Sequence, residues 1–252
     1  MNQTKNFKGI IYKIFSSGPA DKVVYLIDEE GRKNIFIAKG VKKQNSKKAY
    51  AIDLGNYLDI KIVEGYAVPI LVETKALNEF TSWKKEYNRI ILLQFFCEVI
   101  DKFCFEENKD AELFKVFYNT LILTTDKIFY QSAVFLLKIL NSTGNLPQLN
   151  ECVVTGEELS ISNIYYSQDH IGYLSKKASN NIQEPLELIS DRIIKTQKYI
   201  IDHSFQEALR VSLTKEEEVK MLLIEINWIE NIIEKNLKSK EILLSILRSP
   251  AN

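Results

Sequence analysis

A run of basic side chains near the N-terminus is the feature of this sequence with the clearest potential chemistry. Between Glu30 and Asp53 no acidic residue occurs, although the whole chain is neutral, with 33 basic and 33 acidic residues. The basic residues of this run are Arg32, Lys33, Lys39, Lys42, Lys43, Lys47 and Lys48. Positive charge gathered in one stretch of a neutral chain indicates a surface for a phosphate backbone. The alternative is a solvated loop whose lysines keep an edge strand soluble.

The residue types within the run favour contact with a phosphate backbone over the reading of bases. Lysine is a point charge without the planar fork with which arginine reads guanine, and the run is almost all lysine. Aromatic residues of the same region could stack on unpaired bases; they are Tyr12, Phe15, Tyr25, Phe36, Tyr50, Tyr57 and Tyr66. Most of them must fill the core of a small barrel. Tyr50 is favoured for contact with a ligand because it follows Lys47 and Lys48, so it joins the basic run as a candidate nucleic-acid-binding residue.

Other residue patterns give little support for catalysis or metal binding. His170 and His203 stand apart, and no glycine-rich phosphate loop, zincin motif or nucleophile elbow occurs. Cys97, Cys104 and Cys152 are an odd number of cysteines, which predicts reduced thiols in a cytosolic protein. The sequence therefore predicts no catalytic residue, no metal or other cofactor, and no enzyme.

Five short runs rich in Ile, Val, Tyr and Phe predict β-strands at the front of the chain. Turn signals separate these runs, which cover residues 9–15, 22–27, 33–38, 58–62 and 68–74. This spacing predicts a small antiparallel barrel or sandwich, and a five-stranded barrel of the OB type fits it.

From Phe80 onward, apolar residues recur at helical spacing. Helices are predicted over residues 80–105, 110–123, 127–140 and 185–203, and after a capping box in which Thr214 accepts from the Glu217 amide. The segment 150–182 is polar and rich in turn residues, which indicates an insert. The predicted fold class is α+β, with an N-terminal five-stranded OB-fold β-barrel over residues 1–79 and a mostly α-helical domain over 80–252 that carries the irregular insert.

The charge is divided unevenly along the chain. Residues 1–80 hold 13 basic and 9 acidic side chains, and the remainder holds 20 basic and 24 acidic ones. The front of the chain is therefore the part expected to face nucleic acid. Residues 1–8 are polar and lack the apolar core of a signal peptide, and charged residues interrupt the most apolar stretch, residues 90–105. These features predict a cytoplasmic protein without a membrane span.

Three segments, taken in their order along the chain, resemble the bacterial recombination mediator RecO family. They are Pro19-Ala20-Asp21-Lys22-Val23-Val24, Ile37-Ala38-Lys39-Gly40-Val41-Lys42-Lys43 and Leu237-Lys238-Ser239-Lys240-Glu241-Ile242-Leu243. The resemblance covers nearly the whole chain, and the co-linear order of these segments carries more weight than any one of them.

The resemblance implies a non-catalytic DNA-repair protein. Members of the family bind single- and double-stranded DNA, anneal complementary strands, and act with RecR and single-stranded DNA-binding protein (SSB) to load RecA. The loop after the third strand matches the DNA-contacting region of the family, which makes Lys39, Lys42, Lys43 and Lys47 candidate phosphate ligands. The family docks the acidic SSB tail on its helical domain, where either Lys195 and Lys198, or Lys138, are candidate rim residues. A nucleoid-associated location in the cytoplasm follows.

The sequence departs from the family at a zinc site. Many relatives hold zinc in the insert with two Cys-x-x-Cys pairs, whereas the corresponding residues here are Cys152 and Thr155, then Ser175 and Ala178. Three of the four ligands are missing, so we predict that no zinc is bound. Apolar packing would then hold the insert together, with Leu159, Ile161, Ile164, Tyr165 and Leu174 as its candidate core.

A second hypothesis assigns the protein to another functional class. In this reading it is a scaffold whose helical domain docks the tails of partner proteins, and its lysines serve only solubility. Partner binding that survives high salt, together with negligible affinity for DNA, would distinguish this hypothesis from the first.

Overall fold

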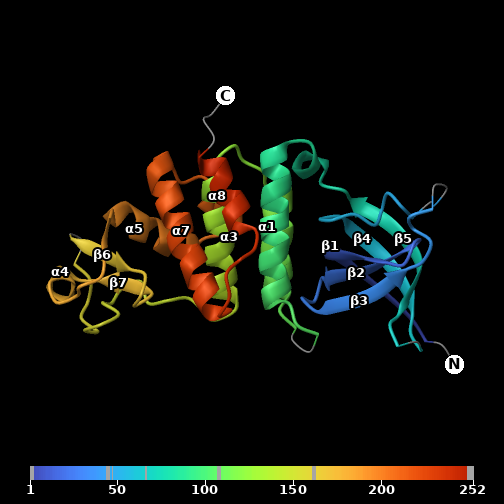
Figure 1. The fold of residues 1–252 in the computed structure, drawn as a ribbon, viewed down its shortest axis with the longest axis horizontal. Coiled ribbons are helices and arrows are strands. Elements are labelled where there is room, and N and C mark those ends of the chain that lie inside the picture. Colours follow the sequence, from blue (N-terminus) through green and yellow to red (C-terminus); the bar gives the residue numbers. More distant parts are fainter. Residues whose placement is uncertain are drawn as a thin grey trace. The chain divides into compact units, whose positions relative to one another are not determined.

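The N-terminal part of the chain folds as a closed five-stranded barrel in the computed structural model (Figure 1). The structure describes residues 3–43, 46, 48–65, 67–106, 109–160 and 163–248. The strands follow the order β1-β2-β3-β5-β4 around the barrel, with β3 parallel to β5 at Ile37 and Ile70. They are β1 (Thr4–Ser17), β2 (Asp21–Asp28), β3 (Lys33–Ala38), β4 (Tyr57–Val63) and β5 (Ile70–Asn78). The predicted α+β fold with an N-terminal OB-type barrel is confirmed.

Strand β1 closes the barrel because it pairs with two neighbours. Its first half is antiparallel to β4, from Thr4 opposite Val63 onward, and its second half is antiparallel to β2. Gly9 pairs with both neighbours, and a side-chain Cβ there would lie 2.3 Å from the carbonyl oxygen of Ile27. A glycine is therefore required where the two ladders meet.

The observed strands differ from the predicted ones mainly at their ends. Strand β1 begins at Thr4, five residues before the predicted start, because its polar first residues pair with β4. Strand β5 runs to Asn78, beyond the predicted end, because residues 75–78 also pair with β4. Cross-strand pairing extends both strands through residues that alternation in the sequence does not mark.

The chain divides into two compact units. The first unit, Met1–Ile122 with Leu237–Asn252, joins the barrel to four helical elements. These are the short 3-10 helix η1 (Thr81–Lys84), α1 (Tyr87–Phe103), α2 (Ala111–Ile122) and α8 (Lys240–Arg248). Trp83 is fully buried and its indole Nε1 donates to the carbonyl of Leu121 at 2.8 Å. This bond and the apolar residues of α1 hold the helices together within the first unit.

The long helix predicted from residue 80 begins later, at Tyr87. Phe80 adopts a left-handed backbone conformation with φ 43°. The residues directly after it form the short 3-10 helix η1 and not the first turn of α1. The C-terminal helix α8 was not predicted as a helix. Its start is held by Glu98 of α1, whose carboxylate accepts hydrogen bonds from the Lys238 and Ser239 amides at 2.9 and 2.8 Å. A cap supplied by a residue about 140 positions earlier leaves no local signal in the sequence.

The second unit, Leu123–Asn236, is formed by helices and a small sheet. Its elements are α3 (Ile128–Ser142), β6 (Ile164–Ser167), β7 (Gly172–Leu174), α4 (Lys176–Ser179), β8 (Glu187–Ile189), α5 (Asp191–Asp202), α6 (Phe205–Ala208) and α7 (Lys215–Ile232). The predicted capping box of α7 is confirmed, with both of its hydrogen bonds present. The helix predicted over residues 185–203 is wrong in its first part, because β8 pairs with β6 and the helix begins only after the N-cap Ser190.

The insert is more regular than its sequence indicates. Strands β7, β6 and β8 form a three-stranded sheet, so the prediction of an irregular insert is corrected. Cys152, Leu174 and Ala178 form its buried core, against which Leu159, Tyr165, Ile182 and Leu186 pack. Of the other predicted core residues, Ile164 is also buried, and Ile161 lies outside the described residues. The sheet was missed because its strands are only three or four residues long.

Among the helices of the described residues, none combines the length and the apolar character that a membrane crossing requires.

A buried polar chain crosses the core of the second unit. The Tyr173 hydroxyl donates to Gln197 Oε1 at 2.7 Å, and Gln197 Nε2 donates to Glu225 Oε1 at 3.2 Å. Glu225 is fully buried. Burial raises the pKa of its carboxyl well above the usual range, and the hydrogen bond from Gln197 opposes this only in part. The folded protein therefore favours the protonated form of Glu225.

This raised pKa predicts a specific dependence of stability on pH. Because the folded state holds a proton that the unfolded state releases, Glu225 lowers the free energy of unfolding as pH rises from the unfolded pKa toward the folded one. The decline is at most about 1.4 kcal/mol per pH unit for one proton. Glu225→Gln removes it, so the stability of the variant relative to the wild type should grow with pH. Urea unfolding between about pH 5 and about pH 8 measures this difference.

The matched control is Glu216→Gln, because Glu216 is exposed on the same helix. The control should show the pH dependence of the wild type. A stability difference between Glu225→Gln and the wild type that stays constant across this pH range would contradict a protonated carboxyl in the core.

Candidate nucleic-acid interface

The segment between β3 and β4, residues 39–56, is here called the basic loop. Two apolar side chains anchor it, because Val41 and Ile52 are buried in the core of the barrel. Its start is bonded to the turn between β1 and β2. The Gly40 amide donates to Asp21 Oδ1 at 2.8 Å, and the Lys42 amide donates to the Ala20 carbonyl at 3.0 Å. The described part of the loop thus has a defined position on the barrel.

Three lysines at the start of the basic loop are exposed: Lys39, Lys42 and Lys43. Lys42 also donates from Nζ to the carbonyl of Gly18 at 3.2 Å, which orients its side chain along the β1–β2 turn. Among the described residues, no carboxylate forms a salt bridge with any of the three. Their charges are therefore available to an anion from solvent.

The remaining basic residues of the run do not join this cluster. Arg32 and Lys33 lie at the start of β3, and Lys39 follows its end, so about 20 Å of strand separates them. Arg32 pairs with Glu30 at 2.5 Å, and Lys33 Nζ lies 5.4 Å from the centre of the Tyr25 ring. These two residues remain candidates for contact with DNA at the other end of β3.

The structure describes only one of the last two lysines of the run, Lys48. Lys48 donates from Nζ to the backbone carbonyls of Leu71 and Val72, at 3.4 and 2.5 Å. Its ammonium thus ties the basic loop to β5, and it stays only a candidate phosphate ligand. Lys47 lies outside the described residues.

Tyr50 is the most exposed of the large apolar and aromatic side chains described, at 86%. Two hydrogen bonds fix its backbone, because the buried Asn56 donates from Nδ2 to the carbonyls of Tyr50 and Ala51 at 3.2 and 2.9 Å. A rigid backbone with an exposed ring is suited to stacking on a base. Sequence reasoning did not single out Phe15, which is 49% exposed near the end of β1.

The four positions of the zinc pattern lie together in the insert. Cys152 packs with Ala178. Burial would raise the pKa of its thiol, but the Thr155 hydroxyl and the amides of Ser175, Thr155 and Val154 donate to the sulfur and lower the pKa to about 7. The Ser175 hydroxyl is bonded to the carboxylate of Glu157.

These residues do not fit a zinc ion. A structural zinc site in proteins takes four thiolate or imidazole ligands, and only Cys152 supplies one. Within the described residues, no cluster of His, Cys, Asp and Glu could hold a metal. Cys152 is instead packed in an apolar cluster with Leu174 and Ala178.

A Ser–His–Glu cluster in the insert differs from a catalytic triad. The Ser167 hydroxyl and the Glu184 carboxylate both lie at Nδ1 of His170, at 3.0 and 2.8 Å. A triad instead needs the nucleophile and the acid on different ring nitrogens. The hydrogen bond from Ser167, opposed by desolvation and helped by His170, lowers the pKa of Glu184 to about 2. The cluster therefore holds the turn between β6 and β7, and the prediction that the protein is not an enzyme stays a prediction.

A family model described as the C-terminal part of recombination protein O matches residues 84–241 of this chain. The chain belongs to the RecO family. The resemblance inferred from three short segments is therefore confirmed.

Several curated relatives, each named DNA repair protein RecO, extend the similarity to nearly the whole chain. The protein of Clostridium perfringens strain 13 is 26% identical over 241 residues, which cover 93% of this chain and 95% of the relative. That of Dehalococcoides mccartyi strain BAV1 is 25% identical over 212 residues, 83% of each chain. That of Caldanaerobacter subterraneus subsp. tengcongensis is 21% identical over 249 residues, 95% of this chain and 97% of the relative. The similarity to RecO proteins thus includes the barrel as well as the helical region.

The geometry of the insert predicts that its stability does not depend on metal. Elemental analysis of the purified protein should find zinc well below one equivalent, and a strong chelator should leave the melting temperature unchanged. Cys152→Ala should still lower stability, by roughly 1 kcal/mol, because the amide and hydroxyl groups around the buried sulfur lose their acceptor. Stoichiometric zinc that is lost together with stability in the chelator would contradict this account.

Proposed function

We propose that this RecO-family protein is a non-catalytic recombination mediator in DNA repair, which binds DNA through the basic loop. The observation that carries the proposal is the cluster of Lys39, Lys42 and Lys43, exposed on an OB-type barrel and not neutralised by a described carboxylate. The names of the relatives support a role in DNA repair.

The chemistry of these residues suits binding that does not depend on sequence. Each lysine that contacts a phosphate releases a counterion, so affinity falls steeply with salt. Contacts to the backbone position a strand but leave the edges of its bases free. Two strands whose phosphates are screened in this way can pair with each other, and this is how we propose that the protein anneals complementary DNA.

The proposal includes partners as well. We propose that the protein acts with RecR and with SSB to load RecA on single-stranded DNA, and that it also binds duplex DNA. A protein that binds a strand through the phosphates leaves the bases of that strand free. A second protein can therefore bind the same strand through its bases.

The DNA-binding proposal predicts the effect of removing the three exposed lysines. A variant with Lys39, Lys42 and Lys43 each changed to Gln should bind a labelled single-stranded oligonucleotide more weakly. The slope of log affinity against log salt should become less steep by about 2, or about 0.7 for each lost contact. Fluorescence anisotropy over a salt series measures both quantities.

The control variant has Lys5 and Lys8 of β1 and Lys75 of β5 changed to Gln, so it loses the same total charge as the first variant. It should retain the salt slope of the wild type. Equal losses in the two variants would show that only overall charge matters, and would count against a site on the basic loop. No binding by the wild type, with partner binding that survives high salt, would favour the scaffold.

One observation supports a docking role for the second unit. Lys198 lines a cavity of about 320 Å³ together with Leu146, Pro147, Leu149 and Ile201, which places a cation beside apolar side chains. Lys195 instead pairs with Asp191 at 2.8 Å. Lys138 donates from Nζ to the carbonyls of Ile201 and His203 near the end of α5. Of the three predicted rim residues, we therefore propose Lys198 as the contact for the acidic tail of SSB.

The docking proposal predicts unequal effects at two neighbouring lysines. Lys198→Glu should weaken the binding of a peptide with the SSB tail sequence by roughly five- to tenfold, since a charge at the rim contributes at most about 1 kcal/mol and reversal adds repulsion. Lys195→Glu, on the same helix, should have a smaller effect. Isothermal titration calorimetry measures both affinities. Equal affinities of the wild type and Lys198→Glu would place the tail elsewhere.

A further inference from the structure

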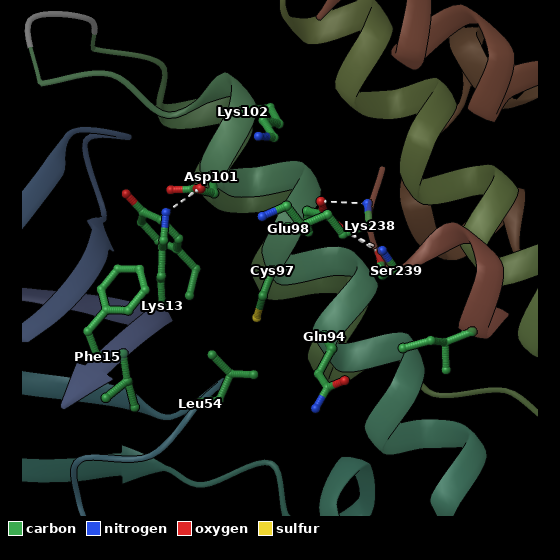
Figure 2. A pocket seen from close by; sticks show the side chains of 13 residues that line it. Lys13, Phe15, Leu54, Gln94, Cys97, Glu98, Asp101, Lys102, Lys238 and Ser239 are labelled. Atoms are coloured by element: carbon green, nitrogen blue, oxygen red, sulfur yellow. Dashed lines mark hydrogen bonds and ion pairs between the residues drawn. The ribbon is translucent and has the colours of Figure 1, made fainter. Parts of the chain in front are cut away.

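A cavity of about 510 Å³ lies beside the barrel within the first unit (Figure 2). Four parts of the chain line it: the second half of β1, the end of the basic loop at Leu54, one face of α1, and the residues at the start of α8. A cavity of this size is in the range of sites for small organic groups. None of the functions described above uses it.

The wall formed by the barrel is apolar and carries an aromatic ring. Phe15 lines the cavity and is 49% exposed, and Leu54 is another apolar lining residue. The edge-to-face contact of Phe15 with Tyr25, with ring centres 5.7 Å apart, holds the ring in place. Ile242 of α8 is also half exposed in the cavity. Lys13 Nζ lies over the Phe15 ring, 5.1 Å from its centre, and Phe15 still keeps 49% of its surface exposed. An exposed ring on a barrel strand can stack on a planar group.

The acidic side chains of the cavity are already bound. Asp101 pairs with Lys13 at 2.7 Å. Both oxygens of Glu98 accept hydrogen bonds from Lys238 and Ser239, as the dashed lines in Figure 2 show. Neither carboxylate is left to repel an anion at close range.

Among the described lining residues, two lysines have ammonium groups that are not paired with these carboxylates. Lys102 and Lys238 line the cavity, and within the described residues neither ammonium forms a salt bridge. Figure 2 shows them on α1 and ahead of α8. The lining of the cavity therefore combines apolar and aromatic side chains with two lysines. This combination matches a planar ring that carries a phosphate.

The basic loop borders the cavity through Leu54. Lys42 is bonded to the turn at Gly18 and Ala20, which directly follows β1. Phe15 lies three residues before Gly18, about 10 Å along an extended strand. The other end of the same loop reaches the cavity at Leu54. A nucleic-acid strand held by Lys39, Lys42 and Lys43 can thus pass from the loop to Phe15.

We propose that this cavity takes an unpaired base of single-stranded DNA, which stacks on Phe15 while a neighbouring phosphate lies against Lys102 and Lys238. The inference rests on the proposed DNA-binding function and adds a site to it that tells single strands from duplex. A base within a duplex is stacked and paired, so it cannot enter, whereas the lysines of the basic loop bind the backbone of either form.

The test compares three labelled ligands: a single-stranded oligonucleotide, the same strand with consecutive abasic positions, and a duplex. Phe15→Ala should weaken binding of the intact strand by roughly five- to 150-fold, the factor expected for the stacking of one base. Binding of the abasic strand and of the duplex should stay as in the wild type. The salt slope should not change, because no charge is removed.

Further variants separate stacking from folding and from charge. Phe15→Leu keeps an apolar side chain without a ring, and should bind like Phe15→Ala while it melts like the wild type. Lys102→Gln with Lys238→Gln should make the salt slope for the single strand less steep by about 0.7, because the two lysines share one phosphate. Tyr87→Ala removes another exposed ring of the first unit, 72% exposed at the start of α1, and should bind all three ligands like the wild type.

The outcomes also separate this inference from the proposed function. Equal binding of the intact strand by the wild type and both Phe15 variants, with binding lost when the three loop lysines are changed, overturns the cavity site and leaves the DNA-binding function standing. No binding of any DNA by the wild type overturns both. Loss of binding to an acidic peptide in the Phe15 variants, with DNA binding unchanged, would assign the cavity to a protein partner and also overturns the inference.

Discussion

The double pairing of strand β1 is the constraint on which the rest of the first unit depends. Seven residues of β1 pair with β4 and close the barrel, and the register with β2 begins at Gly9, where the two ladders overlap. The ladder with β2 shifts between Ile11 and Lys13, which turns the second half of the strand relative to the first. That second half carries Lys13 and Phe15 into the cavity and ends at the turn that anchors the basic loop.

Hydrogen bonds made by acidic side chains decide which charges stay available. Near the barrel, Asp21 accepts from the Gly40 amide, Asp101 pairs with Lys13, and Glu98 caps α8. Each carboxylate therefore has a structural partner, and the exposed lysines of the basic loop are left to solvent. The chain is neutral as a whole, yet its surface is not neutral everywhere, because the opposite charges have different surroundings.

Hydrogen bonds and apolar packing hold the insert together. Cys152 and Ser175 lie close together, and the sulfur accepts hydrogen bonds from the Thr155 hydroxyl and the Ser175 amide. The small sheet and the apolar cluster around Leu174 supply the remaining cohesion. A site with one thiol can be satisfied in this way because amides and a hydroxyl are enough to solvate a single sulfur.

The sequence by itself determined the five strands of the barrel, the helices α1, α2, α3, α5 and α7, the capping box at Thr214 and the family, because alternation, helical spacing and short co-linear segments are local properties. It also indicated Lys39, Lys42 and Lys43, which the structure leaves exposed. Only the tertiary structure decided that Lys48 is bonded to β5 and that Phe15 shares a cavity with Lys102 and Lys238. The physical reason is that closure of the barrel and the cap on α8 join residues far apart in the chain, and no local pattern encodes such pairings.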